Sequence, residues 1–132
     1  MSFDDTTIDQ VLGMKTWAIV GLGNNPERAA FGVSKLLQDK GHKIVPVYPR
    51  AEEVHGVTGY KSLSEIPFQV DVVDCFVNSK LVGKVVDEAI AIGAKAVWLQ
   101  LDVIDEEAVA RAEAAGLLAI MDRCPAIEYR KR

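Results

Sequence analysis

A chain of 132 residues is long enough for one domain, which buries about two thirds of the surface that the unfolded chain exposes. Apolar residues make up 49% and charged residues 26% of the sequence, which excludes a disordered or membrane-embedded protein. The net charge of -4 and the scattered lysines and arginines disfavour a nucleic-acid partner, because phosphate backbones bind clustered basic surfaces.

The two ends of the chain and its cysteines favour a cytoplasmic protein. The first residues, MSFDDTTIDQVLG, carry acids where a secretory signal is basic and then apolar, and no apolar run reaches the roughly 18 residues of a membrane span. Cys75 and Cys124 form no CxxC pair and no disulfide framework, which suits a reducing compartment. We predict a tail over 125–132, whose last three residues form a basic run that is expected to be frayed and solvated.

The chain begins with a predicted helix and a predicted strand. Residues 5–13 have the apolar spacing of a short helix, with Thr6 or Thr7 as its cap and Gly13 as its end. We expect it to cover one edge or end of the core. The apolar run TWAIVGL, residues 16–22, is typical of a strand buried on both faces.

A second helix and strand follow a glycine-rich loop. The helix starts at Ala29, and Gly41 fits its left-handed end. Residues 43–49 predict a strand in which Pro46 indicates an edge-like position or a gap in pairing, because proline cannot donate to a strand ladder. Residues 50–69 predict a long functional or covering loop with one helical turn.

The second half of the chain continues the alternation. Three strands are predicted over 70–77, 95–101 and 117–122, with helices between them over 79–92 and 106–115, the latter capped by Asp105.

Strands that alternate with crossover helices predict a single α/β domain over 1–132, with 1–15 as its helical cover. The expected sheet is parallel and doubly wound, with five strands in the order 3-2-1-4-5. Ligands of such sheets bind outside the carboxyl ends of the strands where the winding reverses, here between the first and fourth strands. This rule selects the loops at 21–28, 47–51, 76–80, 100–104 and 122–126.

The first of these loops is a partial dinucleotide fingerprint. Gly21 and Gly23 fill the first two positions of GxGxxG, but Pro26 fills the third. The glycines alone are also compatible with a simple turn from strand to helix. Donors suited to an anion at a helix N-terminus favour the binding interpretation: Asn24, Asn25 and Arg28.

The end of the second strand distinguishes between nucleotides. NAD-binding sheets place an acid there to accept hydrogen bonds from ribose hydroxyls. The strand ends in PVYPR, no acid occurs before Glu52 and Glu53, and Arg50 suits a phosphate on the ribose. The sequence therefore favours NADP or coenzyme A (CoA) over NAD.

Several segments together resemble the small stand-alone CoA-binding proteins, relatives of the CoA-binding domain of the succinyl-CoA synthetase alpha subunit. The resemblance extends from about Trp17 to Cys124, and it is carried by VGLGNNPERAAFGVSKLL, GHKIVPVYPR, VDVVDCFVNSKLV, EAIAIGAKAVWLQLDV and GLLAIMDRC. It implies a three-layer Rossmann-like fold that binds CoA or an acyl-CoA as a cofactor or cargo at the carboxyl edge of the sheet.

The resemblance also implies a set of ligand contacts. The phosphates would lie against the first loop, the ADP end against the second strand's end, and the adenine or pantetheine against the third loop and the adjoining rim. The residues so assigned are Gly21, Gly23, Asn24, Asn25, Arg28, Val47, Tyr48, Pro49, Arg50, Phe76, Asn78, Gln100 and Arg123. The family commonly has Ser in place of Gly23 and Pro-Ser in place of Ala29 and Ala30, so this loop has fewer hydroxyl donors for phosphate.

The residues predict little catalytic chemistry. His42 is expected to be an exposed turn residue and His55 a solvated loop residue, because no second His or Cys stands at metal-ligand spacing. The synthetase alpha subunit uses a histidine of a second domain, for which this chain has no counterpart.

The cysteines and acids are interpreted as structural. Cys75 is expected in the core, and Cys124 packs or, alternatively, meets the CoA thiol beside Arg123. Asp122 is expected to orient Arg123, and Asp74 has no visible partner carboxylate. No nucleophile, base and orienting group can be assembled from these residues.

Three functions stay open on the sequence. The first is a non-catalytic CoA or acyl-CoA carrier, sensor or regulatory module, with a small-molecule ligand and neither nucleic acid nor membrane as partner. The second is an NADP-dependent oxidoreductase, disfavoured by Pro26. The third is an interaction module that has lost its nucleotide.

Overall fold

The computed structural model describes residues 4–132 of the chain. Within these residues strands and helices alternate as expected, in the order α1 (Asp5–Leu12), β1 (Thr16–Val20), α2 (Ala29–Asp39), β2 (Lys43–Val47), the single-turn 3-10 helix η1 (Leu63–Glu65), β3 (Val72–Cys75), α3 (Ser79–Ala91), β4 (Ala96–Leu99), α4 (Glu106–Ala114), β5 (Leu118–Ile120) and α5 (Pro125–Arg130). The predicted α/β class and the predicted helices and strands are confirmed.

The five strands form one parallel sheet in the order β2-β1-β3-β4-β5. The predicted order 3-2-1-4-5 is wrong, because β3 pairs with β1 and not with β2. After β2 the chain crosses β1 and buries Leu63 and Val70 on the face that α3 and α4 cover. The winding therefore reverses between β1 and β3, and β2 with Pro46 lies at the edge of the sheet.

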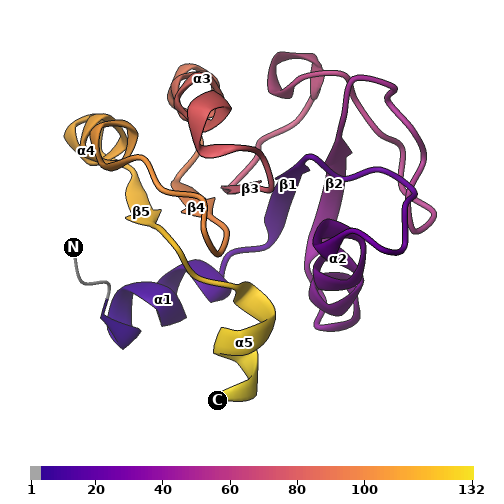
Figure 1. Cartoon of the computed structure of the whole chain (residues 1–132), viewed down its shortest axis with the longest axis horizontal. Helices are drawn as coiled ribbons and strands as arrows, with labels where there is room; N and C mark the ends of the chain where they lie inside the picture. Colours follow the sequence, from indigo (N-terminus) through magenta and orange to yellow (C-terminus); the bar gives the residue numbers. More distant parts are fainter. Residues whose placement is uncertain (1–3) are drawn as a thin grey trace.

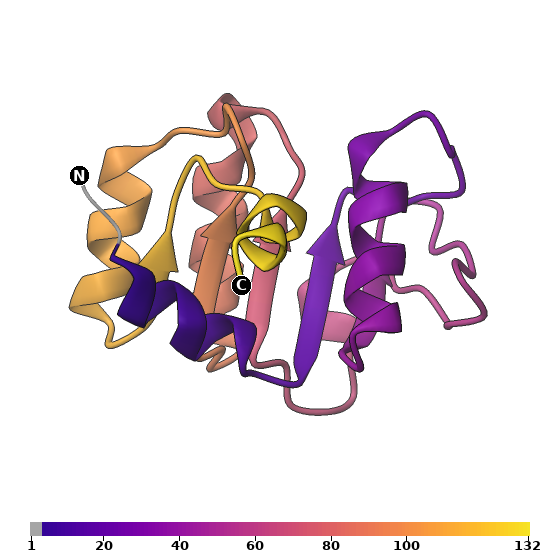
Figure 2. The ribbon, with the colours of Figure 1, turned by 90° about the horizontal axis from the view of Figure 1, so that it is seen from below.

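Helices cover both faces of the sheet in three layers. Figure 1 shows α3 and α4 on one side, and Figure 2 shows α1, α2 and α5 on the other. Alternate strand residues point into the two resulting cores: Ala18 of β1 packs with residues of α3 and α4, whereas Trp17 and Ile19 pack with residues of α1 and α2. This alternation is what buried parallel strands require.

The two ends of the chain differ from their predictions. Asp4 caps α1, with its Oδ1 accepting a hydrogen bond from the Thr7 N–H at 2.8 Å, so the predicted Thr6 or Thr7 cap is wrong. The predicted tail is also wrong, because α5 packs Ala126 into the core. Arg132 forms ion pairs with Asp5 and Asp9 of α1 and with Glu128 of α5.

Both histidines are more buried than predicted. His42 is only 9% exposed, and its Nδ1 lies 2.8 Å from the Met14 carbonyl oxygen. His55 is half-buried, with Nε2 at 2.9 Å from the Phe31 carbonyl oxygen and at 3.2 Å from Ser34 Oγ. Each histidine therefore ties two distant segments together.

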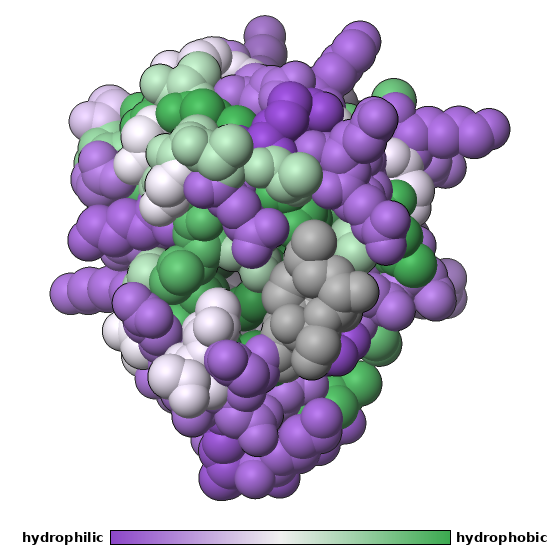
Figure 3. Space-filling view, turned by 90° about the vertical axis from the view of Figure 1, so that its left-hand side faces the viewer, coloured by the Kyte–Doolittle hydropathy of each residue, from purple (hydrophilic) through white to green (hydrophobic). Residues whose placement is uncertain are grey.

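The side of the molecule that carries α4, β5 and α1 has hydrophobic residues gathered near its centre and hydrophilic residues around them (Figure 3). None of the helices within residues 4–132 is long and apolar enough to cross a membrane.

Candidate functional site

The carboxyl ends of β1 and β3 approach each other closely at Gly21. A Cβ atom on Gly21 would lie 2.4 Å from the Phe76 carbonyl oxygen, and the φ angle of +101° also requires glycine. The Gly21 N–H donates to the Val47 carbonyl oxygen at 2.8 Å, so the loop is also tied to β2. The loops after β1, β2 and β3 therefore meet at the point where the winding reverses, as ligand sites of such sheets do.

Three cavities open on this edge, and Gly21 and Arg28 line all of them. The polar cavity, of about 350 Å³, is lined by Gly21, Gly23, Asn24, Asn25, Arg28, Tyr48, Arg50 and Glu52. The apolar cavity, of about 460 Å³, lies between the ends of β1 and β2, the turn at Leu63 and the start of α3. The Gln100 cavity, of about 290 Å³, lies between the N-terminus of α2 and the loops after β3 and β4.

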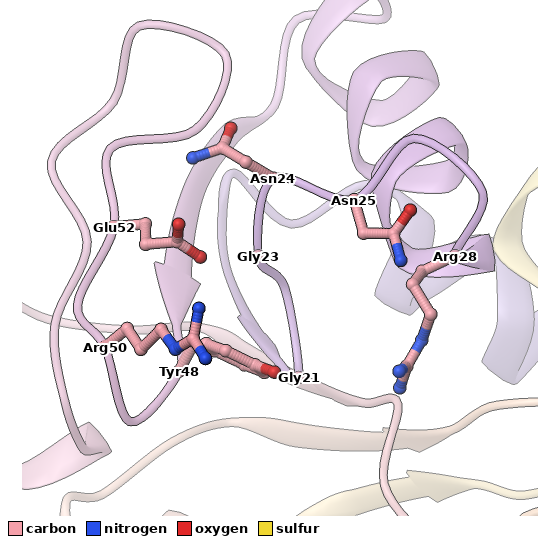
Figure 4. A pocket seen from close by; sticks show the side chains of 8 residues that line it. All are labelled: Gly21, Gly23, Asn24, Asn25, Arg28, Tyr48, Arg50 and Glu52. Atoms are coloured by element: carbon pink, nitrogen blue, oxygen red, sulfur yellow. The ribbon is translucent and has the colours of Figure 1, made fainter.

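Two guanidinium groups face the polar cavity. Arg28 projects from the α2 side and Arg50 from the loop after β2 (Figure 4). Neither forms an ion pair with a residue within 4–132, so both positive charges are available to an anion. The arrangement suits a ligand that carries phosphate groups.

Glu52 also lines the polar cavity, although the sequence places it too far beyond β2 for such a contact. Ala51 has a φ of +49°, and its N–H donates to the Tyr48 carbonyl oxygen at 2.8 Å, so the chain turns back on itself. The Glu52 carboxylate then points toward Gly23 (Figure 4), where a Cβ atom would lie 3.0 Å from Oε1. A carboxylate that can accept hydrogen bonds from ribose hydroxyl groups thus lies beside the second glycine of the loop.

The apolar cavity combines hydrophobic walls with a charged rim. Its hydrophobic side chains come from the strand ends, the turn after β2 and α3, and include Val47, Leu63, Phe76, Leu81 and Val85. The rim carries Lys61, Lys84 and Glu88. Flat apolar walls with few charged groups suit a heterocyclic or aliphatic ligand part.

The N-terminus of α2 opens into the Gln100 cavity. Arg28 is the N-cap of this 11-residue helix, and its side chain makes no capping hydrogen bond. Ala29 and Ala30 line the cavity beside Gln100 and Asn78. The exposed end of the helix dipole favours negative charge or oxygen acceptors there.

Two buried side chains near this cavity have unpaired oxygens. Within residues 4–132, three buried oxygens have no hydrogen-bond partner: Oδ1 and Oδ2 of Asp74 and Oε1 of Gln100. Burial raises the pKa of Asp74 well above 3.8, so that the carboxyl group is neutral at pH values where exposed aspartates are ionised.

The predicted site residues come together with one exception. Twelve of them line at least one of the three cavities, whereas Arg123 lines none of the three. Arg123 follows β5, two strands beyond β3 and so about 10 Å from the reversal point. The Arg123 Nη1 group donates to the Asp122 carbonyl oxygen at 2.9 Å. Asp122 Oδ1 accepts from the Asp102 N–H at 2.7 Å, so the Asp122 carboxylate holds the loop after β4.

The thiols lie away from solvent. Cys75 is fully buried, as predicted, and its pKa is raised by burial and by Asp74. Cys124 is 7% exposed and packs against the core beneath α5, which fits the packing interpretation. No cluster of metal-ligating side chains occurs within residues 4–132.

Comparison with curated proteins finds two kinds of relative. The chain is 37% identical over 110 residues to the Bacillus subtilis protein YneT, and the alignment covers 83% of this chain and 82% of that protein. It is also 36% identical over 91 residues to the alpha subunit of acetate–CoA ligase (ADP-forming) II of Pyrococcus furiosus. This alignment covers 68% of this chain and 20% of that subunit. The chain thus spans about one fifth of the length of the ligase subunit.

Solved structures agree with these relatives. A protein from Pyrococcus horikoshii superposes with a TM-score of 0.93 at 39% identity, over 98% of this chain and 92% of that one. A redesigned form of the protein PH1109 gives a TM-score of 0.94 at 37% identity, with the same coverage. The sequence profile of the CoA binding domain matches residues 15–130. The resemblance seen in the sequence is thereby confirmed, and the chain belongs to the CoA binding domain family.

Proposed function

We propose that the protein binds CoA or an acyl-CoA at the carboxyl edge of the sheet and acts as a carrier, sensor or regulatory module rather than as an enzyme. The observation that carries the proposal is the meeting of three chemically different cavities at Gly21 and Arg28. CoA has three matching parts, which are a phosphorylated ribose with a diphosphate, an adenine, and a chain of two amides that ends in a thiol.

Each part of CoA is assigned by its chemistry. The phosphates face Arg28, Arg50 and the α2 N-terminus. The adenine enters the apolar cavity, beside Phe76 and Leu63, and the pantetheine chain follows the Gln100 cavity, where Asn78 and Gln100 offer amides. Arg123, which lines none of the three cavities, remains a predicted ligand contact on the outer rim of the site.

The side chains around the cavities support binding without chemistry. No cysteine or histidine lines any of the three cavities, whose titratable groups are tyrosine, arginine, lysine and glutamate. Ser62 of the apolar cavity contacts the Glu65 carboxylate at 3.4 Å, and neither His42 nor His55 lines a cavity where it could act as the base for this hydroxyl. A cytoplasmic location belongs to the same proposal and fits the two free cysteines.

Calorimetric and thermal titration with CoA, acetyl-CoA and dephospho-CoA tests the proposal. CoA at about 100 times its Kd should stabilise the protein by about 2.7 kcal/mol. Dephospho-CoA should bind more weakly than CoA, because it has no 3'-phosphate to bind the Arg50 guanidinium group. Arg50→Gln should remove this difference, whereas the exposed Arg130→Gln at the end of α5 is the matched control. The absence of binding by CoA and acetyl-CoA would overturn the proposal.

A second candidate, an NADP-binding oxidoreductase subunit, has one observation in its favour. Glu52 and Arg50 together line the cavity beside Gly23, where a dinucleotide would place its adenosine ribose. Titration with NADPH, followed by nicotinamide fluorescence, tests this candidate in the same samples. If neither NADPH nor any CoA ligand binds, an interaction module without a nucleotide is the function left.

A further inference from the structure

Asp74 and Gln100 present three buried oxygens that accept no hydrogen bond within residues 4–132. Asp74 is 0% exposed and Gln100 is 7% exposed, so bulk water reaches neither group freely. Buried polar atoms in proteins are nearly always paired. Three unpaired buried oxygens on two neighbouring chain segments therefore need a physical explanation.

The register of the sheet brings the two side chains to the same face. Asp74 lies opposite Trp98 on β4, and Gln100 follows two residues later, with its N–H donating to the Cys75 carbonyl oxygen at 3.3 Å. Residues two apart along a strand point to the same face, and the strand spacing sets the Asp74 and Gln100 Cα atoms about 8 Å apart. Both side chains thus point to the face that α2 covers, where Gln100 lines its cavity.

A neutral carboxyl group changes the hydrogen-bond balance at this place. An ionised Asp74 would add two acceptors beside the Gln100 acceptor, whereas the protonated acid has one O–H donor. Burial already favours the neutral form of Asp74. Where Gln100 directs Oε1 at Asp74, only the protonated acid provides a donor for that oxygen.

We propose that Asp74 is a positioning residue, which donates its carboxyl proton to Gln100 Oε1 and thereby turns the Gln100 Nε2 group toward the cavity. The Gln100 side chain then presents N–H donors, so the ligand part bound there offers an oxygen acceptor such as an amide or thioester carbonyl. This step rests on the proposed function, in which the pantetheine chain of CoA or its acyl group occupies the Gln100 cavity.

Substitutions of Asp74 test the pair through ligand affinity. In Asp74→Asn the side-chain amide still donates to Gln100 Oε1, and we expect a Kd for CoA within about threefold of the unmodified protein. Asp74→Leu has a similar size without a donor, and we expect a Kd about tenfold higher, the equivalent of 1.4 kcal/mol. The same Asp74→Leu change in a Gln100→Ala protein should have no further effect, because the residue acts through Gln100. An equal loss in both backgrounds would overturn the proposal.

Spectroscopy of the free protein tests the pair without any ligand. The carbon-13 signal of the Asp74 carboxyl group should be that of a neutral acid at about pH 7. The nitrogen-15 signal of the Gln100 amide should move in Asp74→Leu and return in Asp74→Asn. An ionised Asp74 overturns the inference even if CoA binds. If neither CoA nor acetyl-CoA binds, the proposed function fails, and these two signals still test whether Asp74 donates to Gln100.

Discussion

At the scale of single residues, glycine controls how closely two loops can approach. The Phe76 carbonyl oxygen occupies the place that a Cβ atom of residue 21 would need, at 2.4 Å. The contact lies between backbone groups, so it cannot be relieved by turning a side chain. The close approach of the loops after β1 and β3 therefore requires glycine at residue 21.

Gly21→Ala should lower the free energy of unfolding by about 1–3 kcal/mol, because it combines a backbone clash with an unfavourable φ angle. Urea denaturation measures the change. The matched control is Gly32→Ala in α2, where a Cβ atom meets nothing within 4 Å. That substitution should raise the free energy of unfolding by about 0.5–1 kcal/mol, because alanine favours a helix interior. Equal effects of the two substitutions would contradict this account of Gly21.

Gly23 lies where the family resemblance leads us to expect a serine, and the structure shows what a serine would contact. Its Cβ atom would lie 3.0 Å from Glu52 Oε1, which is the far end of a flexible side chain, and 3.5 Å from the Tyr48 ring. We expect Gly23→Ser to fold with little loss of stability and to bind CoA a few-fold more tightly, because its hydroxyl adds a donor for phosphate.

Calorimetry on Gly23→Ser and on Gly23→Ala separates the hydroxyl from the added bulk. Gly23→Ala displaces Glu52 equally but adds no donor. Tighter binding by both variants would assign the effect to the displaced Glu52 charge instead. Weaker binding by both would mean that the backbone at residue 23 must touch the ligand directly.

At the scale of elements, the hydrophobic pattern of the sequence was sufficient to place the helices and strands from α1 to β5, but neither α5 nor the order of the strands in the sheet. The run TWAIVGL predicts a buried strand whichever strands lie beside it, because burial on both faces is local information. Strand order depends on which way the chain crosses after β2, and residues 48–71 have no regular period that reveals this. Pro46 did contain the information, since proline favours an edge strand and β2 is one.

The wrong strand order also explains the one site residue that lies apart. With the reversal placed between the first and fourth strands, the loop after β5 would be the second loop from the site. The observed reversal between β1 and β3 moves Arg123 one strand farther away. Glu52 was missed for the opposite reason, because a turn with Ala51 at φ +49° brings it back beside Gly23, and no pattern in the sequence indicates that turn.

At the scale of the whole molecule, the two ends of the chain are joined on the face opposite α3 and α4. The His42 ring lies between the Met14 carbonyl oxygen, which accepts from Nδ1, and the Tyr129 hydroxyl, which contacts Nε2. Tyr129 Oη is also 3.3 Å from the Leu12 carbonyl oxygen. His42, which directly precedes β2, thus connects the end of α1 with α5. It lies at the amino end of β2, whereas the polar and apolar cavities lie at the carboxyl end of that strand.

The burial of His42 in this connection makes stability depend on pH. Burial lowers the pKa of His42 below its usual 6.5, against the opposing effect of the Met14 and Lys15 backbone groups. Between the folded and the unfolded pKa, the unfolded chain binds more protons, so the free energy of unfolding rises with pH in that window. The stabilisation is complete above about pH 6.5 and declines as the pH falls through 6.5 toward the folded pKa.

Urea denaturation of the protein and of His42→Gln between about pH 7.5 and 5.5 measures this dependence, in a range above the titration of most carboxylates. The glutamine can still donate to the Met14 carbonyl oxygen but carries no titrating ring. As the pH falls from about 7.5 to 5.5, we expect the free energy of unfolding of the unmodified protein to decrease relative to that of His42→Gln, because the raised pKa of Asp74 adds the same opposite dependence to both proteins. Parallel curves for the two proteins would assign the pH dependence to another group. Because His42 is distant from Gly21 and Arg28, we expect the affinity for CoA to show a different pH dependence from the free energy of unfolding. The same pH dependence in both quantities would mean that the contacts between the chain ends are coupled to the proposed CoA site.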